Sequence, residues 1–439
     1  MLDKGHLSMK TILSCLLFTL TFTGCGYTRY IYIYSDPDPT AISYTNATDQ
    51  FQAATAKVDI TPNHNVWLAG YHPGRKSTGI HDPIEARIVI LQDTKGFSIA
   101  VVSVDMLGFL KNDTDALRKR LSRIKHLEIF VLSSHNHSSP DLIGIYGPTL
   151  GRIPLVSGRD EAYITQSIEK ISHAIEMAMN RLTPVVLSFS RSSPEITESY
   201  VEEPDHDFDI WNIEKIIDSR LEPLALIVVA GCHPTTLIRS NTLITSDFPG
   251  VMRDILDREL QTNTLFINSA PGGVTYGKRS RAYNNFKRRA AVGHIFAREV
   301  LNTNRALFTR LEPKPFRFAT TSSRLPMTNP LFILGSALGF IPNDGWLSRT
   351  TEVSTFTIGD ITVVTVPGEL FPSISREIKS KNLRITEIWS LANDEIGYIL
   401  REKDFDKEEF RYWHGVSLGP DTGTIILKNA QKALQAVHQ

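Results

Sequence analysis

Histidine pairs that follow an apolar segment can hold a metal ion or transfer protons. In VLSSHNHSSPD, an apolar run leads directly into His135 and His137. Alternate side chains of extended backbone point the same way, so both imidazoles can face one cavity at the end of a strand. Imidazole is the commonest zinc ligand, and this spacing indicates a metal or catalytic site. A polar turn with two solvated histidines has the same pattern.

A second apolar run, LALIVVAGCHPTTL, also ends in a histidine, His233, and Asp247 follows at some distance in NTLITSDFPG. Two separate strands that each deliver a histidine at the same kind of position favour a shared site more than either does alone. We expect Cys232 to be a small buried residue rather than a nucleophile. We expect His173, in the middle of a helix, to be structural.

A carboxylate and two tyrosines extend the set of possible ligands. Glu369 follows a strand and a Pro-Gly turn in ITVVTVPGELF, where the amides of a helix N-terminus can keep it ionised and oriented for a metal. An ordinary first-turn glutamate has the same position. Tyr398 and Tyr412 lie in the long segment that begins LANDEIGY, and their residue type alone indicates no function, because tyrosines are commonly buried in cores.

The Gly-rich turn in NTLFINSAPGGVTYG contains Gly273 and Thr275. Turns of this kind expose backbone amides that can bind an anion or a developing oxyanion. The glycine-lysine-serine/threonine ending of a Walker phosphate loop is missing, which argues against a nucleotide as ligand.

Alternating strands and helices must position these residues. The apolar runs FSIAVVSVD, LEIFVLSS, PVVLSFS, LALIVVAG, TLFINSA and ITVVTVPG predict strands, several of them buried on both faces. Apolar residues recur with helical spacing over residues 161–181, 249–260, 286–301, 371–379 and 427–437. This alternation predicts an α/β fold with a buried mixed β-sheet and flanking helices. Residues 327–348 are apolar and show no clear strand or helix boundaries. They fit either the entrance to a pocket for an apolar substrate or an ordinary packing segment.

The composition and the N-terminus restrict the cellular setting. The chain has 439 residues and 47 basic and 47 acidic side chains, so no global field would attract nucleic acid. Residues 1–25 predict a signal peptide, with Met9 as a possible start, and LTFTGC resembles the lipobox in which Cys25 is lipidated. Residues 26–52 predict a flexible tether and residues 53–439 a single catalytic domain. We therefore expect a bacterial cell-envelope protein, anchored by lipid at the periplasmic or outer-membrane face.

Taken in order, these segments resemble the neutral ceramidase family, the neutral/alkaline non-lysosomal zinc amidases that cleave the N-acyl bond of ceramide. The motifs that carry the resemblance run from AKVDITP through LAGYHPGRKSTGIHDPIEARIVIL, SVDMLGF, SSHNHSSPD, CHPTTLIRSNTLITSDFPG, VPGEL and ANDEIGY to RYWHGVSLGP. They cover nearly the whole chain beyond the tether. The resemblance implies a catalytic Zn²⁺ site whose ligands are His135, His233, Glu369 and Tyr398.

The resemblance also implies roles for residues around the metal. His137 matches the acid/base histidine of the family, Tyr412 its substrate-contacting tyrosine, and Gly70 in LAGYH a backbone position that lines the pocket. Arg191 matches the active-site arginine, within a loosely similar segment. Thr275 and the amides of the turn around Gly273 would contact the substrate and steady the oxyanion.

Two departures from the family pattern bear on activity. The family typically has GDVSPN where this chain has GGVTYG, so the aspartate is missing and Thr275 replaces a serine. The immunoglobulin-like domain of full-length ceramidases is also expected to be missing.

The resulting hypothesis is zinc-dependent hydrolysis of an amide in an N-acyl sphingolipid or a related N-acyl lipid. Two alternatives stay open: a zinc amidase for a non-ceramide N-acyl substrate, and a surface lipoprotein that keeps the scaffold for binding without catalysis. A two-metal phosphatase would need several clustered aspartates, which the sequence lacks.

Overall fold

The structure is a computed structural model that describes residues 28–34, 48–150, 153–282, 284–303, 305–342 and 345–438. The predicted signal peptide, Met9 and Cys25 lie outside the described residues. The third cysteine, Cys232, is buried and carries a free thiol.

A nine-stranded mixed sheet forms the centre of the molecule. Its strands follow the order β14-β12-β11-β9-β2-β4-β5-β6, and β16 pairs with β9. Neighbouring strands are antiparallel except for the parallel pairs β12·β14 and β5·β6. The strands are β2 (Phe51–Asp59), β4 (Glu85–Gln92), β5 (Ser98–Val104), β6 (Leu127–Ser133), β9 (Thr183–Ser192), β11 (Phe208–Ile217), β12 (Arg220–Ala230), β14 (Asn263–Asn268) and β16 (Thr309–Arg310).

A second sheet packs face to face against the first. It has five strands in the order β1-β17-β18-β19-β21, of which only β19·β21 is a parallel pair. Aromatic rings fill the interface: Phe130 of the large sheet stacks on Phe356 of the small one at 4.9 Å between ring centroids. The strands are β1 (Thr28–Tyr34), β17 (Phe318–Pro326), β18 (Ser348–Ile358), β19 (Ile361–Thr365) and β21 (Thr386–Trp389).

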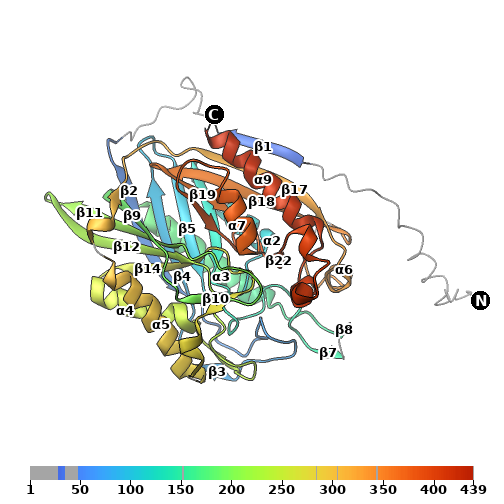
Figure 1. The fold of residues 1–439 in the computed structure, drawn as a ribbon. Helices are drawn as coiled ribbons and strands as arrows, with labels where there is room; N and C mark the ends of the chain where they lie inside the picture. The colour runs from blue at the N-terminus through green and yellow to red at the C-terminus, as the bar shows by residue number, and fades with distance from the viewer. Residues whose placement is uncertain are drawn as a thin grey trace, which may run out of the picture.

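Helices cover the outer faces of both sheets, which gives four layers (Figure 1). Helices α2 (Lys111–Arg120) and α3 (Glu161–Met179) bury apolar residues against one half of the large sheet. Helices α4 (Asp247–Leu260) and α5 (Asn285–Asn302) cover the other half, and α7 (Pro372–Lys379) and α9 (Asp421–His438) cover the small sheet.

Short elements connect the layers. Two-stranded ladders join β3 (Gly79–Ile80) to β13 (Leu243–Ile244), β7 (Thr149–Leu150) to β8 (Ile153–Pro154), β10 (Thr197–Ser199) to β15 (Val274–Tyr276), and β20 (Glu369–Leu370) to β22 (Tyr398–Ile399). The remaining helices are α6 (Pro330–Ala337), α8 (Arg411–His414), and the 3₁₀ turns η1 (Lys278–Ala282), η2 (Arg305–Leu307), η3 (Glu402–Asp404) and η4 (Glu408–Phe410).

The α/β class with buried mixed sheets and flanking helices is confirmed, although the strands divide between two sheets. The last helix begins at Asp421 rather than at residue 427, because Pro420 and the acidic Asp421 start it ahead of the apolar pattern. The expected tether was wrong in part. Thr28–Tyr34 pairs with β17 as β1, and its sequence TRYIYIY is rich in the aromatic and β-branched residues that favour strands.

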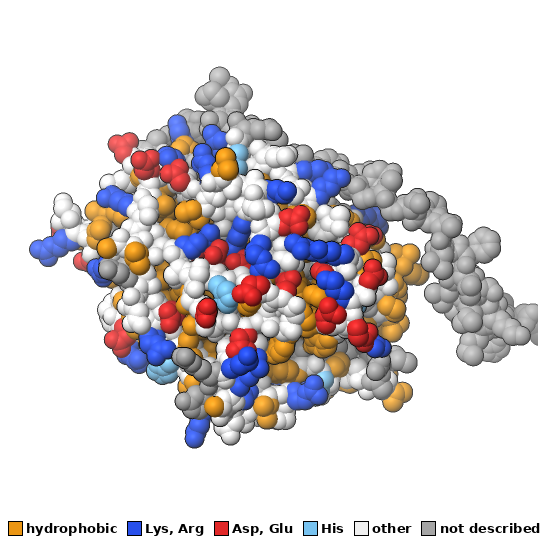
Figure 2. Space-filling view, in the orientation of Figure 1, with side chains coloured by type: hydrophobic (Ala, Val, Ile, Leu, Met, Phe, Trp, Pro, Cys, Tyr) orange, Lys and Arg blue, Asp and Glu red, His pale blue; other side chains and the backbone are white. Residues whose placement is uncertain are grey.

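Acidic and basic side chains are interspersed over the face shown in Figure 2, as expected for a chain whose formal net charge is zero. Among the described helices, none is both long enough and apolar enough to cross a bilayer.

Candidate metal centre and cavity

Four side chains from distant parts of the chain meet at one point. The Nε2 atoms of His135 and His233 lie 3.0 and 2.8 Å from the same carboxylate oxygen, Oε2 of Glu369. The hydroxyl of Tyr398 lies 3.2 Å from His233 Nε2. All four side chains are buried. The structure therefore brings together the four ligands that the resemblance implies.

Backbone carbonyls fix the proton on each imidazole. Nδ1 of His135 lies 2.9 Å from the carbonyl oxygen of Leu107, and Nδ1 of His233 lies 2.9 Å from that of Val274. A carbonyl oxygen only accepts, so each Nδ1 is the donor, and in a neutral imidazole the Nε2 atom then presents a lone pair. Two lone pairs and a carboxylate oxygen that converge repel one another unless a cation lies between them. This donor set fits a divalent metal ion.

The ends of two strands of the large sheet position the histidines. His135 follows β6 with a φ of 69°, a left-handed conformation that is unusual for histidine, and its N–H donates to the carbonyl of Met106 at 2.9 Å. His233 follows β12, and its N–H donates to the carbonyl of Val274 at 3.1 Å. The hydrogen bond to Met106 stabilises the strained backbone of His135, and this conformation points the imidazole ring at the site.

A short parallel ladder positions the other two ligands. Glu369 of β20 lies directly opposite Tyr398 of β22. Burial alone would raise the pKa of the Glu369 carboxyl, but protons on the facing Nε2 atoms of His135 and His233, or a cation in their place, lower it well below its usual range. Burial and the negative charge of Glu369 raise the pKa of the Tyr398 phenol well above its ordinary value. A cation at this point would stabilise the ionised forms of both Glu369 and Tyr398.

His137 lies beside the candidate metal ligands, and neither of its ring nitrogens has a hydrogen-bond partner among the described residues. Its ring centroid is 4.9 Å from that of His135. Burial, together with His135 and His233, lowers the pKa of His137 well below its usual value. Its ligating atom lies within 4.8 Å of those of His135 and His233, so all three can also be regarded as a possible metal-binding group.

Gly70 makes room for His137. A Cβ atom at this position would lie 2.4 Å from Cγ of His137, and the φ of Gly70 is 106°. Only glycine satisfies both the close approach and the backbone conformation. Gly70 also lines the cavity described below.

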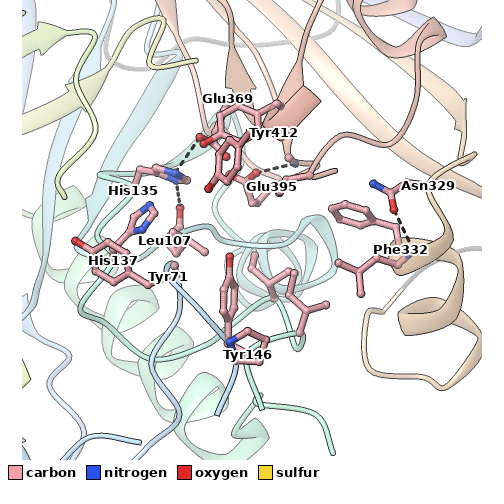
Figure 3. Close-up of a pocket in the computed structure, with 18 of the residues that line it drawn as sticks. Tyr71, Leu107, His135, His137, Tyr146, Asn329, Phe332, Glu369, Glu395 and Tyr412 are labelled. Carbon is pink, nitrogen blue, oxygen red and sulfur yellow. Dashed lines mark hydrogen bonds and ion pairs between the residues drawn. The ribbon is translucent and has the colours of Figure 1, made fainter. Parts of the chain in front are cut away.

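A cavity of about 690 Å³ opens beside these ligands (Figure 3). Its polar end carries His135, His137 and Glu369, and Tyr412 and Glu395 lie close by in the same view. Its far wall is apolar, and Phe332 of α6 belongs to it. The predicted entrance segment 327–348 thus contributes α6 to this wall. A small-molecule site of this shape suits a ligand with one polar and one apolar end.

The Gly-rich turn lies elsewhere than expected. Thr275 is buried in β15, and neither Thr275 nor Gly273 lines the cavity. The amides of Gly272 and Val274 donate to the carbonyls of Leu370 and Pro271, so they are not free for an oxyanion. The turn instead presents the Val274 carbonyl that orients His233. The structure therefore places Thr275 and Gly273 away from the cavity, although substrate and oxyanion contacts were expected of them.

Arg191 also lies away from the cavity. It belongs to β9, and its guanidinium forms two bonds with Asp209, at 2.7 and 2.6 Å, in addition to an ion pair with Asp207. An arginine bound in this way has no free donors for a substrate at the metal centre. The prediction failed because the surrounding segment resembles the family only loosely.

Two lining residues escaped sequence reasoning. Glu395 is buried at the cavity although it stands in the ANDEIGY motif that carried the resemblance. Burial and the nearby Glu369 raise the pKa of the Glu395 carboxyl well above its usual value. Tyr146 directs its hydroxyl toward the polar end of the cavity in Figure 3. The histidines were identified because each comes directly after an apolar strand. Neither Glu395 nor Tyr146 has such a position.

The chain is similar in sequence to known neutral ceramidases. The chain is 25% identical over 240 residues to the neutral ceramidase of Drosophila melanogaster, which covers 49% of this chain and 33% of the relative. It is 24% identical over 247 residues to that of Drosophila pseudoobscura pseudoobscura, covering 50% and 34% of the two chains. The chain is a divergent relative of the neutral ceramidases. No protein-family model matches it.

Solved ceramidase structures share the fold. A ceramidase complexed with C2 superposes with a TM-score of 0.75 at 15% identity, covering 89% of this chain and 76% of that one. The neutral ceramidase from Pseudomonas aeruginosa gives 0.72 at 15% identity, covering 89% and 75%. The curated ceramidases are matched over only about a third of their own length. The likeness to the ceramidases thus covers the fold and about half of the sequence, and the activity of this chain is a separate proposal.

Proposed function

We propose that this chain is a zinc-dependent amidohydrolase that cleaves the N-acyl bond of ceramide or a closely related N-acyl sphingolipid. The observation that carries the proposal is the convergence of His135 Nε2 and His233 Nε2 on one oxygen of Glu369, with both Nδ1 protons held by backbone carbonyls. The likeness to neutral ceramidases supports the choice of bond and substrate.

His135, His233, Glu369 and Tyr398 would hold the zinc ion. Two imidazoles and a carboxylate form a common ligand set for a catalytic zinc, and the phenol of Tyr398 stands beside it. When bound, Zn²⁺ lowers the pKa of water and polarises a carbonyl group, which is the chemistry that amide hydrolysis needs at neutral pH.

Residues beside the ligands would move protons and orient the substrate. Cleavage of an amide leaves an amine that must take up a proton. His137 lines the cavity and is not one of the four proposed ligands, so its imidazole can supply that proton. Its nitrogens form no hydrogen bond to described residues, so they are available to the substrate. Tyr412 lines the same cavity and carries a hydroxyl that can donate to the oxygen of the scissile carbonyl.

The shape of the cavity supports a lipid substrate. Its volume of about 690 Å³ lies in the range of sites that enclose a small molecule. Phe332, Leu331 and Leu334 form an apolar wall from α6. An acyl chain placed along this wall would leave its amide at the end that carries Glu369 and the histidines.

Release of fatty acid by the purified protein tests the proposal. We expect hydrolysis of a short-chain ceramide, loss of activity after removal of metal with a chelator, and recovery when Zn²⁺ is added. Undiminished hydrolysis by metal-free protein, or absence of hydrolysis of every N-acyl lipid by zinc-loaded protein, would contradict it. The second result would favour a binding protein on the same scaffold.

We also propose that Cys25 anchors the chain to a membrane of the bacterial cell envelope, which rests on the LTFTGC motif. Metabolic labelling with a radioactive fatty acid should mark the wild type and not the variant Cys25→Ala. Equal labelling of both chains would show that the anchor is not at Cys25.

A further inference from the structure

Glu395 presents an unsatisfied carboxyl oxygen at the cavity. Its Oε1 atom accepts a hydrogen bond from the N–H of Gly397 at 2.7 Å. Its Oε2 atom is buried and has no partner among the described residues, although the side chain lines the cavity. A buried carboxyl oxygen without a partner is costly, and its presence at a binding cavity points to a ligand that completes it.

The backbone around Glu395 is firmly held. Asn393 accepts from the N–H of Val131 at 2.8 Å through its Oδ1 atom and donates to Glu352 at 2.9 Å through Nδ2. Asp394 forms an ion pair with Arg349. These contacts leave Glu395 little freedom to turn away and find another partner.

Gly108 provides the space for the side chain. A Cβ atom at this glycine would lie 2.4 Å from Cβ of Glu395 and 2.5 Å from its Cγ. The carboxyl group is thus fixed at its end and along its stem, which makes it a preformed contact rather than a mobile one.

The chemistry at this end of the cavity limits the complementary group. A hydroxyl is neutral and both donates and accepts, so it pairs with Oε2 whether or not that oxygen carries a proton.

We infer that Glu395 binds a hydroxyl group of the substrate that lies close to the amide bond. This inference rests on the proposed function, which places the amide at the polar end of the same cavity. It makes Glu395 the residue that distinguishes an N-acyl amino alcohol from an N-acyl amine that lacks the hydroxyl.

Binding of matched ligands that cannot be hydrolysed tests the role of Glu395 directly. The probes are two octyl ureas, one with a hydroxyethyl and one with a propyl group on the second nitrogen, measured by calorimetry on zinc-loaded protein. We expect the wild type to bind the hydroxyethyl urea about tenfold or more tightly, because the propyl urea leaves Oε2 unpaired. In Glu395→Met, which keeps the length of the side chain without its polar atoms, the two affinities should become equal.

Glu377→Gln is the control, because this glutamate lies on α7 and pairs with Arg401 outside the cavity. Its preference should equal that of the wild type. Equal binding of both ureas by the wild type, or no binding of either, would overturn the inference, as would a preference that persists in Glu395→Met. Glu395→Ala serves as a second variant if Glu395→Met does not fold, since truncation only opens space.

Hydrolysis of short-chain ceramide by the same wild-type protein separates the two proposals. A hydroxyl preference in binding without any hydrolysis would contradict the proposed function and support the role of Glu395. Hydrolysis without a hydroxyl preference would contradict the role of Glu395 alone.

Discussion

The position of a proton on each of two imidazoles decides the character of the site. His135 and His233 both donate from Nδ1 to a backbone carbonyl, which leaves Nε2 to face Glu369. His137 has no such bond on either nitrogen. A histidine that ligates a metal is usually oriented by a bond from its other nitrogen, so His137 differs from the two ligands in the feature that defines them.

Alanine variants of His135 and His137 should therefore differ in metal content. We expect His135→Ala to lose bound zinc after dialysis, because it removes a ligand, whereas His137→Ala should keep zinc and lose at least a hundredfold in kcat. Zinc content by mass spectrometry and release of fatty acid check the two effects.

His173→Ala is the matched control, since this histidine is exposed on α3. It should keep both zinc and activity. Loss of zinc from His137→Ala would show that the three histidines form the metal site and that the assignment of His137 to proton transfer is wrong.

Substitution of Gly70 should disturb His137 directly. In Gly70→Ala, the new Cβ would meet the His137 ring at 2.4 Å in a backbone with a φ of 106°. We expect a loss of about 2 kcal/mol in the free energy of unfolding and a fall in activity of tenfold or more. Chemical denaturation and a hydrolysis assay measure the two quantities.

Gly74→Ala is the control that distinguishes the effect of backbone strain from that of crowding against His137. Gly74 has a φ of 80°, but a Cβ there would meet nothing within 4 Å. Gly74→Ala should cost about 1 kcal/mol through strain alone and leave hydrolysis unchanged. Equal loss of activity in both variants would contradict the packing of Gly70 on His137.

The residues that the sequence singles out as ligands lie together in the structure, whereas the groups around them were not predictable, for a physical reason. A histidine at the end of a buried strand is visible as a pattern, and His135 and His233 both follow one. The partners that orient them are backbone carbonyls of Leu107 and Val274, which any residue type would supply. Thr275 was misplaced because a Gly-rich turn does not reveal which of its groups are already bonded.

At the scale of elements, one loop joins the metal centre to the large sheet. Asn393, with a φ of 63°, bonds to Val131 of β6 through its side chain, and Tyr398 follows shortly after it. The same asparagine also bonds to Glu352 of β18. The loop that carries Tyr398 is thus fixed to both sheets.

Asn393→Ala should destabilise the chain and weaken metal binding together. It leaves the buried N–H of Val131 without its acceptor, so we expect a loss of about 2–4 kcal/mol in the free energy of unfolding. Zinc affinity should also fall, because Tyr398 is less well held. Urea denaturation and a zinc titration measure the two effects.

Asn180, exposed at the C-terminus of α3, provides the comparison. Asn180→Ala should change stability by no more than about 0.5 kcal/mol. A stability of Asn393→Ala equal to that of the wild type would refute the anchoring role of the loop.

Strands and helices with strong periodicity were predictable, and their partners were not. β5, β6, β12 and β14 follow apolar runs that the sequence displays. Nothing in those runs indicates that β17, β18, β19 and β21 belong to a separate sheet, because a strand's sequence does not name the strand it pairs with. The pairing of β1 with β17 was not predicted, because polar residues surround this segment and residues 26–52 were therefore assigned to a flexible tether.

At the scale of the whole molecule, an ion-pair cluster joins the helical layer to the small sheet. Arg118 of α2 lies 2.7 Å from Glu352 of β18, and Lys111 lies 3.5 Å from it. Burial alone would raise the pKa of Glu352, but Arg118 and Lys111 lower it from 4.5 to about 2.

This lowered pKa predicts how stability depends on pH. A carboxyl whose pKa is lower in the folded than in the unfolded state stabilises the fold above the unfolded value, and the stabilisation is lost as pH falls to the folded value. We expect wild-type protein to lose on the order of 3 kcal/mol from this group between pH 4.5 and about 2. In Glu352→Gln the free energy of unfolding should be lower at neutral pH and should change less over that range.

Glu259→Gln provides the comparison, because this glutamate is exposed and pairs with Arg258 at 3.4 Å. Its acid profile should match that of the wild type. If Glu352→Gln and wild type lost stability in parallel below pH 4.5, the cluster would not be the source of the acid sensitivity.

The central claim is that one divalent cation is bound by side chains from four distant segments. Anomalous diffraction from crystals soaked in a zinc salt tests it most directly, because it locates the metal independently of any activity. The account predicts one strong peak in contact with His135 Nε2, His233 Nε2 and the Glu369 carboxylate, with Tyr398 beside it. Absence of a peak there, or a peak held by other residues, would contradict it.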